Sequence, residues 1–171
     1  MTTVGFTYAS LMGLGPAYAV ETAGRAAALG YDSYWTAETT GPEAFSLLAA
    51  AGAAAPGVAL GTGVLALQLR TPPLAAMSAA TLDELSDGRV ILGLGTSGQR
   101  VIEHWHGEQF GKPLQRLREY CEIISLMVSG EKVFYEGEIF KLQRGFKLLF
   151  EPVRKHIPIH GDGPGRRQEK R

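Results

Sequence analysis

A glycine-rich run near the middle of the chain has residue types that could hold a cofactor. Residues 93–98 read Gly-Leu-Gly-Thr-Ser-Gly, a G-x-G-x-x-G pattern, directly after the apolar residues 90–92. Such a run can bind a pyrophosphate at a helix N-terminus in a dinucleotide-binding fold. That fold also needs an acidic residue about 20 positions further on, at the end of a strand. Here Arg118 and Glu119 occupy those positions inside a helical pattern, so the sequence disfavours a nicotinamide site.

The sequence does not indicate metal or thiol chemistry. His104 and His106 are two residues apart and lack an evident third ligand, so we expect no metal site. Cys121 is the only cysteine, which excludes an internal disulfide. It shares a helical face with Leu117 and Ile124, and we expect it to be a small core residue.

Composition and charge narrow the class of protein further. The chain has 171 residues, of which 45% are hydrophobic and 20% charged, an ordinary globular balance. Seventeen Lys and Arg residues match seventeen Asp and Glu residues. A net charge of zero gives no indication of a nucleic-acid or membrane-surface partner. No secretion signal and no membrane-spanning apolar run is evident, so we expect a cytoplasmic protein.

Strands and helices that alternate along the sequence must position the glycine run. The apolar segments predict strands at residues 4–8, 34–37, 58–67, 89–94 and 157–160. The helical patterns cover residues 16–29, 42–55, 72–86 and 113–129, with Pro42 in the first turn of the second helix. Strands that are apolar on both faces indicate a parallel sheet covered by helices. Residues 133–142 break the alternation and predict a hairpin with its turn at Glu136 and Gly137.

This pattern leaves two α/β architectures open. A doubly wound sheet would be complete at this length. A closed eight-unit barrel needs about 250 residues.

Three segments resemble a known family. Residues 89–98, 103–107 and 110–120 are similar to the luciferase-like (LLM class) flavin and deazaflavin oxidoreductases, in particular to the branch that depends on coenzyme F-420. Residues 28–38, 61–64 and 71–89 agree, so the resemblance covers residues 3–160. It implies an α/β fold, a TIM (β/α)8-type barrel of the bacterial luciferase-like family. With about five βα units, we expect the barrel to be incomplete.

The resemblance implies a coenzyme site at the carboxyl ends of two strands. Its expected residues are Gly63, Val64, Gly93, Gly95, Thr96, Ser97 and Gly98. Gly93 and Gly95 would let a flat tricyclic ring approach the backbone without a Cβ in the way. Thr96, Ser97 and the amides that follow would hydrogen-bond the polar edge of the ring. At Gly63-Val64 the family often has a non-proline cis peptide, in a bulge behind the ring.

Two carboxylates are the expected catalytic residues. Glu103 follows the coenzyme strand and could exchange the proton that accompanies hydride transfer. Glu38 ends the second strand and would hydrogen-bond the substrate or coenzyme; its alternative role is a charge at a helix N-terminus. His104 and His106 are expected to be surface or hydrogen-bonding residues, while Trp105 between them packs its loop onto the barrel.

The expected function is an oxidoreductase that transfers hydride between coenzyme F-420, a deazaflavin, and a small organic substrate. Deazaflavin-dependent members often carry a histidine after the second strand, and residues 37–40 contain none. FMN therefore remains an alternative cofactor, with an FMN-dependent monooxygenase as the alternative enzyme. The Gly-Thr-Ser-Gly spelling favours the deazaflavin branch.

The composition changes abruptly after the last expected strand. We divide the chain into the N-terminal part of a barrel, residues 1–160, and an atypical polar tail, residues 161–171. The expected origin of the tail is a truncation or a frameshift. Half a barrel leaves open strand edges. We therefore also consider a non-catalytic remnant, or a homo-oligomer in which a neighbour covers those edges.

Overall fold

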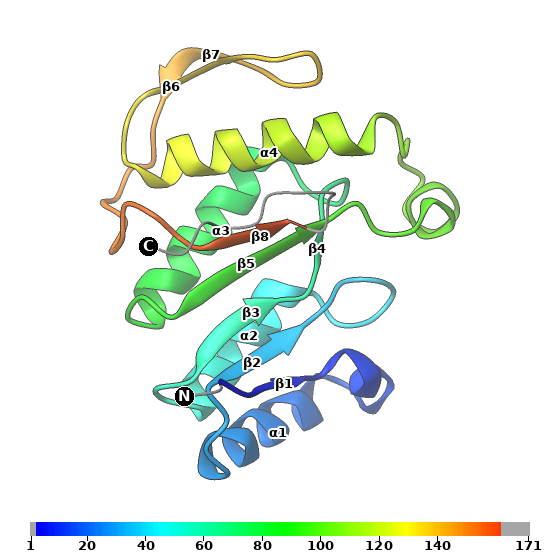
Figure 1. Ribbon diagram of the computed structural model, residues 1–171, viewed down its shortest axis with the longest axis vertical. Coiled ribbons are helices and arrows are strands. Elements are labelled where there is room, and N and C mark those ends of the chain that lie inside the picture. Colours follow the sequence, from blue (N-terminus) through cyan, green and yellow to red (C-terminus); the bar gives the residue numbers. More distant parts are fainter. Residues whose placement is uncertain (1–2, 162–171) are drawn as a thin grey trace.

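Five parallel strand positions form one sheet (Figure 1). The computed structural model describes residues 3–161. The strands lie in the order β1 (Gly5–Thr7), β2 (Ser33–Thr36), β3 (Ala59–Thr62), β5 (Val90–Gly95) and β8 (Ile159–Gly161). The short β4 (Leu65–Ala66) continues β3 along the same edge of β5. All these pairings are parallel, as the doubly apolar strands predict.

A helix follows each strand position from β1 to β5, which confirms the predicted alternation. The α-helices are α1 (Pro16–Ala28), α2 (Ala44–Ala54), α3 (Pro72–Leu85) and α4 (Pro113–Val128). A 3-10 helix, η1 (Ala9–Leu14), follows β1, and a π-helix, η2 (Val101–Trp105), follows β5. In Figure 1, α2 and α3 lie behind the strands. The alternating helices and parallel strands form an α/β fold, as expected from the sequence.

The start of α2 differs from the sequence-based expectation. Pro42 does not occupy the first turn, because Glu43 is the N-cap and the helix begins at Ala44. The Glu43 carboxylate accepts hydrogen bonds from the backbone N–H groups of Phe45 and Ser46, at 3.0 and 2.8 Å. A carboxylate at this position satisfies N–H groups that have no partner within the helix. The cap therefore sets the boundary that the proline was expected to set.

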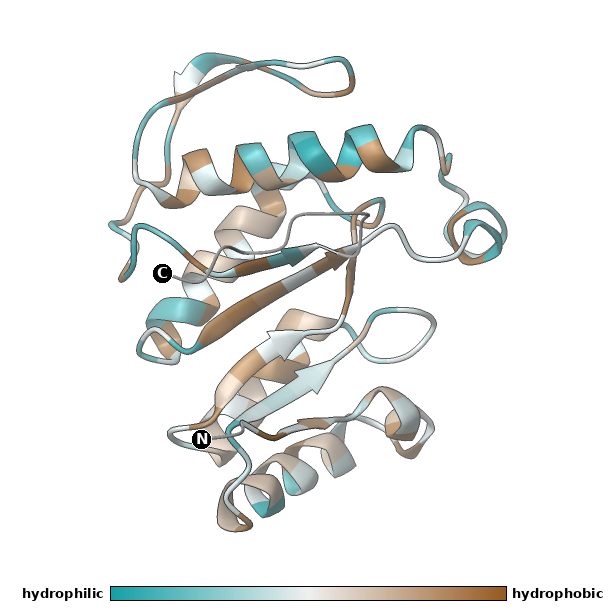
Figure 2. Ribbon diagram, in the orientation of Figure 1, coloured by the Kyte–Doolittle hydropathy of each residue, from teal (hydrophilic) through white to brown (hydrophobic). Residues whose placement is uncertain are grey.

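One face of the sheet packs against the helices α1 and α2. The Tyr34 hydroxyl contacts the carbonyl oxygen of Ala19 and the hydroxyl of Thr22 on α1, and Leu60 lies against Gly52 on α2. Because side chains alternate along a strand, the next residue after each of these faces away from the helices. In Figure 2, β5 is mostly brown, that is hydrophobic, whereas β2 is pale. We call the side away from α1 and α2 the open face.

The hairpin β6 (Val133–Glu136) and β7 (Lys141–Phe146) packs across α4 (Figure 1). Its turn covers residues 137–140, where Gly137 N–H donates to the carbonyl of Phe140, rather than Glu136 and Gly137 alone. A side chain on α4 explains why the turn is longer than expected. There the Glu119 carboxylate accepts hydrogen bonds from the backbone N–H groups of three turn residues, Glu138, Ile139 and Phe140.

The two outer strands each have one unpaired edge within residues 3–161. β1 pairs only with β2 there, and β8 pairs only with β5. Gly161 still belongs to β8, so the expected boundary after residue 160 falls inside this strand. The rest of the expected tail, residues 162–171, lies outside the described residues. No helix in the described part is long and apolar enough to cross a membrane.

Candidate functional site

A bulge interrupts the pairing of β3 with β5. The ladder stops at the pair Gly61 and Ile91 and resumes at Leu65 and Leu94, so the β3–β4 side has one extra residue. At the interruption the Thr62 hydroxyl bridges the two strands. We call residues 62–64 the β3 bulge. It lies at the carboxyl ends of the parallel strands, where barrel enzymes place their active sites.

Backbone hydrogen bonds hold the β3 bulge on its other side as well. Gly63 N–H donates to the carbonyl of Thr36 at 2.6 Å, and Glu38 N–H donates to the carbonyl of Val64 at 3.1 Å. The peptide bond between Gly63 and Val64 is cis, which confirms the conformation expected from the family resemblance. Gly63 is exposed and Val64 is half-buried, so the fixed bulge also presents a surface.

The reason why Gly93 and Gly95 are glycines differs from the expected one. A Cβ on Gly93 would overlap the carbonyl oxygen of Thr62, and a Cβ on Gly95 would lie 2.6 Å from Cγ2 of Val64. The space beside both glycines is therefore filled by the β3 bulge, not left open for a ring. The two glycines let the bulge lean over β5, and the bulge itself carries the accessible surface.

The expected loop after β5 lies next to this bulge along the strand. Thr96 and Ser97 are half-buried, and Ser97 has a positive φ of 55°. Gly98 is exposed, and nothing lies within 4 Å of the position that its Cβ would occupy. The Gly98 carbonyl accepts from the N–H groups of Val101 and Ile102, which starts η2. The structure therefore places all seven expected coenzyme residues around the carboxyl ends of β3, β4 and β5.

Glu38 lies at the end of β2 and is buried, with 6% of its surface exposed. One carboxylate oxygen accepts from the N–H of Ala44 at 3.2 Å, and the other lies 2.6 Å from Nη1 of Arg70. Arg70 also pairs with Glu43, at 2.7 Å. Burial alone would lower the pKa of Arg70, but the adjacent Glu38 carboxylate raises it, so the guanidinium stays charged. Sequence analysis missed Arg70, because residue separation does not show that it reaches Glu38.

Glu103 is exposed on η2. Its two carboxylate oxygens lie 3.1 and 3.0 Å from Nε2 of Gln99, one turn earlier. Trp105 does not pack its loop onto the barrel as expected, because 65% of its surface is exposed. Ile102, which is fully buried, anchors η2 instead. A five-residue helix presents few inward positions, and the aliphatic side chain occupies the one that is buried.

A cavity of about 310 Å³ connects η2 with the loop after β2. Its lining includes Glu38, Thr39, Leu69, Arg70, Trp105 and His106. The His106 ring nitrogen Nε2 lies 3.3 Å from the carbonyl oxygen of Thr39, a contact that joins the two loops. Glu103 is not among the residues that line this cavity. The two expected catalytic carboxylates therefore have different surroundings.

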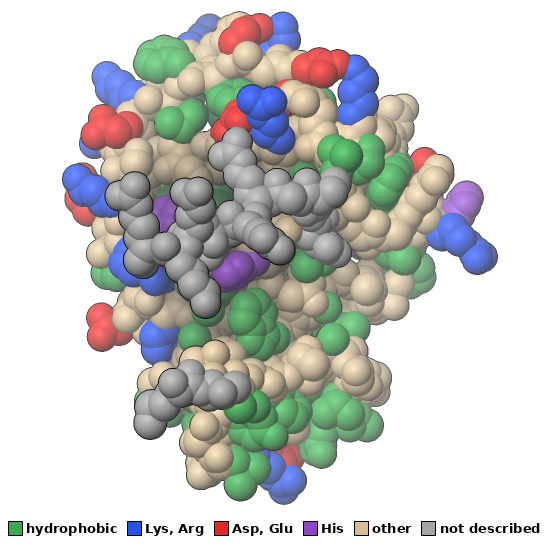
Figure 3. Space-filling model, viewed as in Figure 1, with side chains coloured by type: hydrophobic (Ala, Val, Ile, Leu, Met, Phe, Trp, Pro, Cys, Tyr) green, Lys and Arg blue, Asp and Glu red, His purple; other side chains and the backbone are tan. Residues whose placement is uncertain are grey.

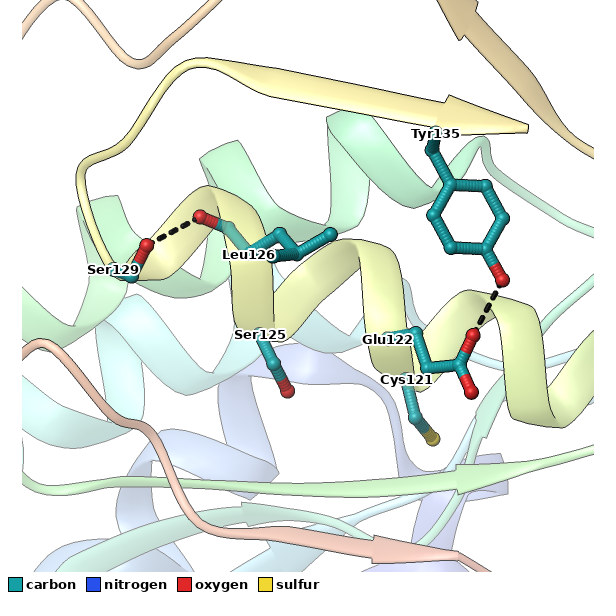
Figure 4. Close-up of a pocket in the computed structure, with 6 residues that line it drawn as sticks. All are labelled: Cys121, Glu122, Ser125, Leu126, Ser129 and Tyr135. Atoms are coloured by element: carbon teal, nitrogen blue, oxygen red, sulfur yellow. Dashed lines mark hydrogen bonds between the residues drawn. The ribbon is translucent and has the colours of Figure 1, made fainter. Parts of the chain in front are cut away.

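A second cavity, of about 560 Å³, lies between α4 and β6 and is lined by Cys121 and Tyr135, among others (Figure 4). Burial raises the pKa of the Cys121 thiol to about 11, so it is protonated at neutral pH. Cys121 is half-buried and packs against the core, close to its expected role. The Tyr135 hydroxyl donates to Glu122 at 2.5 Å. None of the expected site residues lines this cavity.

On the face shown in Figure 3, charged side chains lie mainly around α4 and the hairpin, and hydrophobic side chains gather over the β1 end of the sheet. Within residues 3–161, no group of three or more His, Cys, Asp or Glu side chains is placed to hold a metal ion.

Comparison with known proteins identifies the family of this chain. Residues 3–167 match the family model described as luciferase-like monooxygenase. The chain therefore belongs to the luciferase-like monooxygenase family.

Two relatives carry names that refer to a coenzyme. A protein of Mycobacterium tuberculosis named as a coenzyme F-420-dependent oxidoreductase is 42% identical over 76% of this chain and 41% of its own length. An F-420-dependent glucose-6-phosphate dehydrogenase of Intrasporangium calvum is 33% identical over 94% of this chain and 52% of its own. The chain thus spans about half the length of the curated relatives it matches.

Solved structures show the same fold. An F-420-dependent secondary alcohol dehydrogenase, in complex with an F-420–acetone adduct, matches with a TM-score of 0.82 and 24% identity. The match covers 95% of this chain and 52% of that one. The oxygenating constituent of 3,6-diketocamphane monooxygenase from Pseudomonas putida, in complex with FMN, matches with a TM-score of 0.80 and 21% identity. That match covers 94% of this chain and 51% of the other.

Proposed function

We propose that this chain binds the ring of coenzyme F-420 against the β3 bulge and serves an oxidoreductase that acts on a small organic substrate. The observation that carries the proposal is the bulge itself. It is fixed from β2 and β5 by hydrogen bonds, leans over two glycines, and still exposes Gly63. A rigid, exposed backbone surface suits a flat ring, because the protein loses little conformational entropy there when the ring binds.

Polar atoms near the bulge suit the edge of such a ring. The Gln68 side-chain amide has no hydrogen-bond partner in the described structure. Gln68 follows β4 by two residues. A buried polar group without a partner calls for an explanation, and a ligand that supplies the partner is one. An amide offers both a donor and an acceptor, which matches the imide edge of a flavin or deazaflavin.

The chain's own residues would divide the work of binding and proton transfer. The coenzyme, when bound, supplies the hydride chemistry. Thr96, Ser97 and Gly98 would hold its polar edge from the end of β5. Glu103 would exchange the accompanying proton, because its carboxylate is exposed and its one side-chain partner is neutral. Glu38 would act as a positioning residue, because Arg70 and the α2 N-terminus already engage its two oxygens.

Two relatives named for coenzyme F-420 support the choice of a deazaflavin, and their identities are 42% and 33%. FMN is the second candidate, because the structural match to an FMN complex is similar in quality. Loops commonly carry the residues that select a substrate, so a difference in these loops would give this chain a different substrate from its relatives.

A ligand titration tests the proposal. Purified protein is titrated separately with F-420, FMN and NADPH, and absorbance and fluorescence of each coenzyme are followed. Saturable binding of F-420, tighter than that of FMN and without binding of NADPH, is the expected result. Tighter FMN binding would assign the chain to the flavin branch. Absence of binding to both ring systems would contradict the proposal and favour a non-catalytic module. Size-exclusion chromatography on the same sample reports whether a homo-oligomer is present.

A further inference from the structure

Trp35 lies on the open face of the sheet. Its neighbour Tyr34 faces α1, so the alternation of side chains turns the indole away from the helices. The indole Nε1 donates to the Ser33 hydroxyl at 2.8 Å, which fixes the rotation of the ring. Although no helix covers it, Trp35 is half-buried, because it lies against the sheet itself.

Glycines on both neighbouring strands make room for this indole. A Cβ on Gly61 of β3 would overlap its six-membered ring, and a Cβ on Gly5 of β1 would lie 2.9 Å from Nε1. The same six-membered ring lies 3.5 Å from the Cβ position of Gly63. The indole therefore spans from β1 across β2 to β3, and its edge lies beside Gly63 of the β3 bulge (strands in Figure 1).

We propose that Trp35 is a positioning residue for the coenzyme ring, because its indole supports Gly63 and so sets the place of the surface on which the ring packs. This inference rests on the proposed function. Hydrogen bonds to Gly93, Thr36 and Glu38 hold the three residues of the bulge in turn, whereas the indole lies beside Gly63 on the open face. A tryptophan suits this role, because it offers a large rigid surface with only two rotatable side-chain bonds.

The test begins with the unchanged chain and then compares variants. Trp35→Ala removes the support, and Trp35→Phe keeps an aromatic ring. Gly61→Ala displaces the indole by the overlap described above. Its effect must vanish in the Trp35→Ala background, where the added methyl has room. Gly24→Ala on α1, where the new Cβ makes an ordinary 3.5 Å contact, and Phe146→Leu on the exposed hairpin are the matched controls.

The dissociation constant for F-420 and the visible circular dichroism of the bound coenzyme are measured. The second quantity reports the orientation of the ring, which a purely structural defect would leave unchanged in molecules that still bind. We expect Trp35→Ala to weaken binding about tenfold and to alter the dichroism, and Trp35→Phe to recover most of the affinity. We expect Gly61→Ala to weaken binding only when Trp35 is present.

Each outcome has a definite meaning. If the unchanged chain binds neither F-420 nor FMN, the proposed function fails and this inference fails with it. If it binds, and Trp35→Ala binds with the same affinity and dichroism, only the role of Trp35 is overturned. Additive effects of Gly61→Ala and Trp35→Ala would likewise overturn it. Should Trp35→Ala not fold, Gly61→Ala and Trp35→Phe carry the comparison, and unchanged affinity and dichroism in Gly61→Ala would contradict the inference.

Discussion

The Thr62 hydroxyl donates to the carbonyl oxygen of Gly93 at 2.8 Å and accepts from the N–H of the same residue at 2.9 Å. One side chain thus replaces two backbone hydrogen bonds at the place where β3 and β5 stop pairing. Thr62 is almost fully buried, with 1% of its surface exposed. This pair of bonds lets the strand bulge without leaving a buried peptide group of Gly93 without a partner.

Removal of the Thr62 hydroxyl should destabilise the fold. Thr62→Val keeps the shape of the side chain but leaves the N–H and carbonyl of Gly93 without partners in a buried place. We expect the free energy of unfolding in urea to fall by about 1–3 kcal/mol for each group. Thr62→Ser, which keeps the hydroxyl, is the control and should lose much less. Equal stability of the Val and Ser variants would show that the bridge is unimportant.

Gly93 and Gly98 should respond differently to the same substitution. Gly93→Ala places a Cβ on the carbonyl oxygen of Thr62, and backbone must move to admit it. We expect a loss of about 1–3 kcal/mol in unfolding free energy, together with weaker coenzyme binding. Gly98→Ala meets open space and should leave stability nearly unchanged. Thermal unfolding of both variants makes the comparison, and a stable Gly93→Ala protein would refute the packing described for the bulge.

Arg70 should be needed for stability because it neutralises a buried carboxylate. Arg70→Met leaves Glu38 buried without its ionic partner, a change that typically costs about 3–5 kcal/mol. The double variant Glu38→Gln with Arg70→Met should recover part of this loss, because it removes the uncompensated charge. Arg25→Met breaks the exposed pair with Glu21 and should cost less than about 1 kcal/mol. Chemical denaturation measures all three, and equal losses for Arg70→Met and Arg25→Met would contradict this assignment.

The hairpin should detach from α4 in acid. Burial alone would raise the pKa of Glu119, but hydrogen bonds from Gln115, Phe140 and Ile139 outweigh it and lower the pKa below its ordinary value. A lowered folded-state pKa gives stability that is present above the unfolded value, about 4.3, and is lost as the pH falls through the folded value. Hydrogen-exchange protection of the amides at 138–140 should therefore decrease below about pH 4.

Glu119→Gln is the control for this pH effect. It should show weaker protection of the same amides at neutral pH and little change on acidification, because the titrating carboxylate is gone. Protection in the unchanged chain that stays constant down to pH 3, on the order of one unit below the unfolded pKa, would contradict the role assigned to Glu119.

The sequence predicted the main elements because their signals are local. Apolar runs and helix-stopping residues such as Gly30 mark strands and helices within a few residues of their actual ends. The helix start at Ala44 was predicted less well, because the Glu43 carboxylate competes with Pro42 for the cap and the sequence does not rank the two. The four-residue hairpin turn depends on Glu119, which is distant in the sequence.

The site was predicted in outline but not in its packing. The spacing of the glycines located the end of β5, yet it could not show that Thr62 and Val64 fill the space beside them. Arg70 and Trp35 were missed for the same reason. Their roles arise from contacts across strands, with Glu38 and with Gly61, that a single sequence does not reveal.

Amide chemical shifts during an F-420 titration test most directly whether the β3 bulge binds the coenzyme. A 15N-labelled sample of the 18.3 kDa chain is suited to two-dimensional NMR. We predict saturable shifts that are largest at Gly63, Val64 and residues 95–98, with the hairpin amides unchanged. Shifts confined to the cavity beside Cys121 and Tyr135, or no shifts at high coenzyme concentration, would contradict the binding site proposed here.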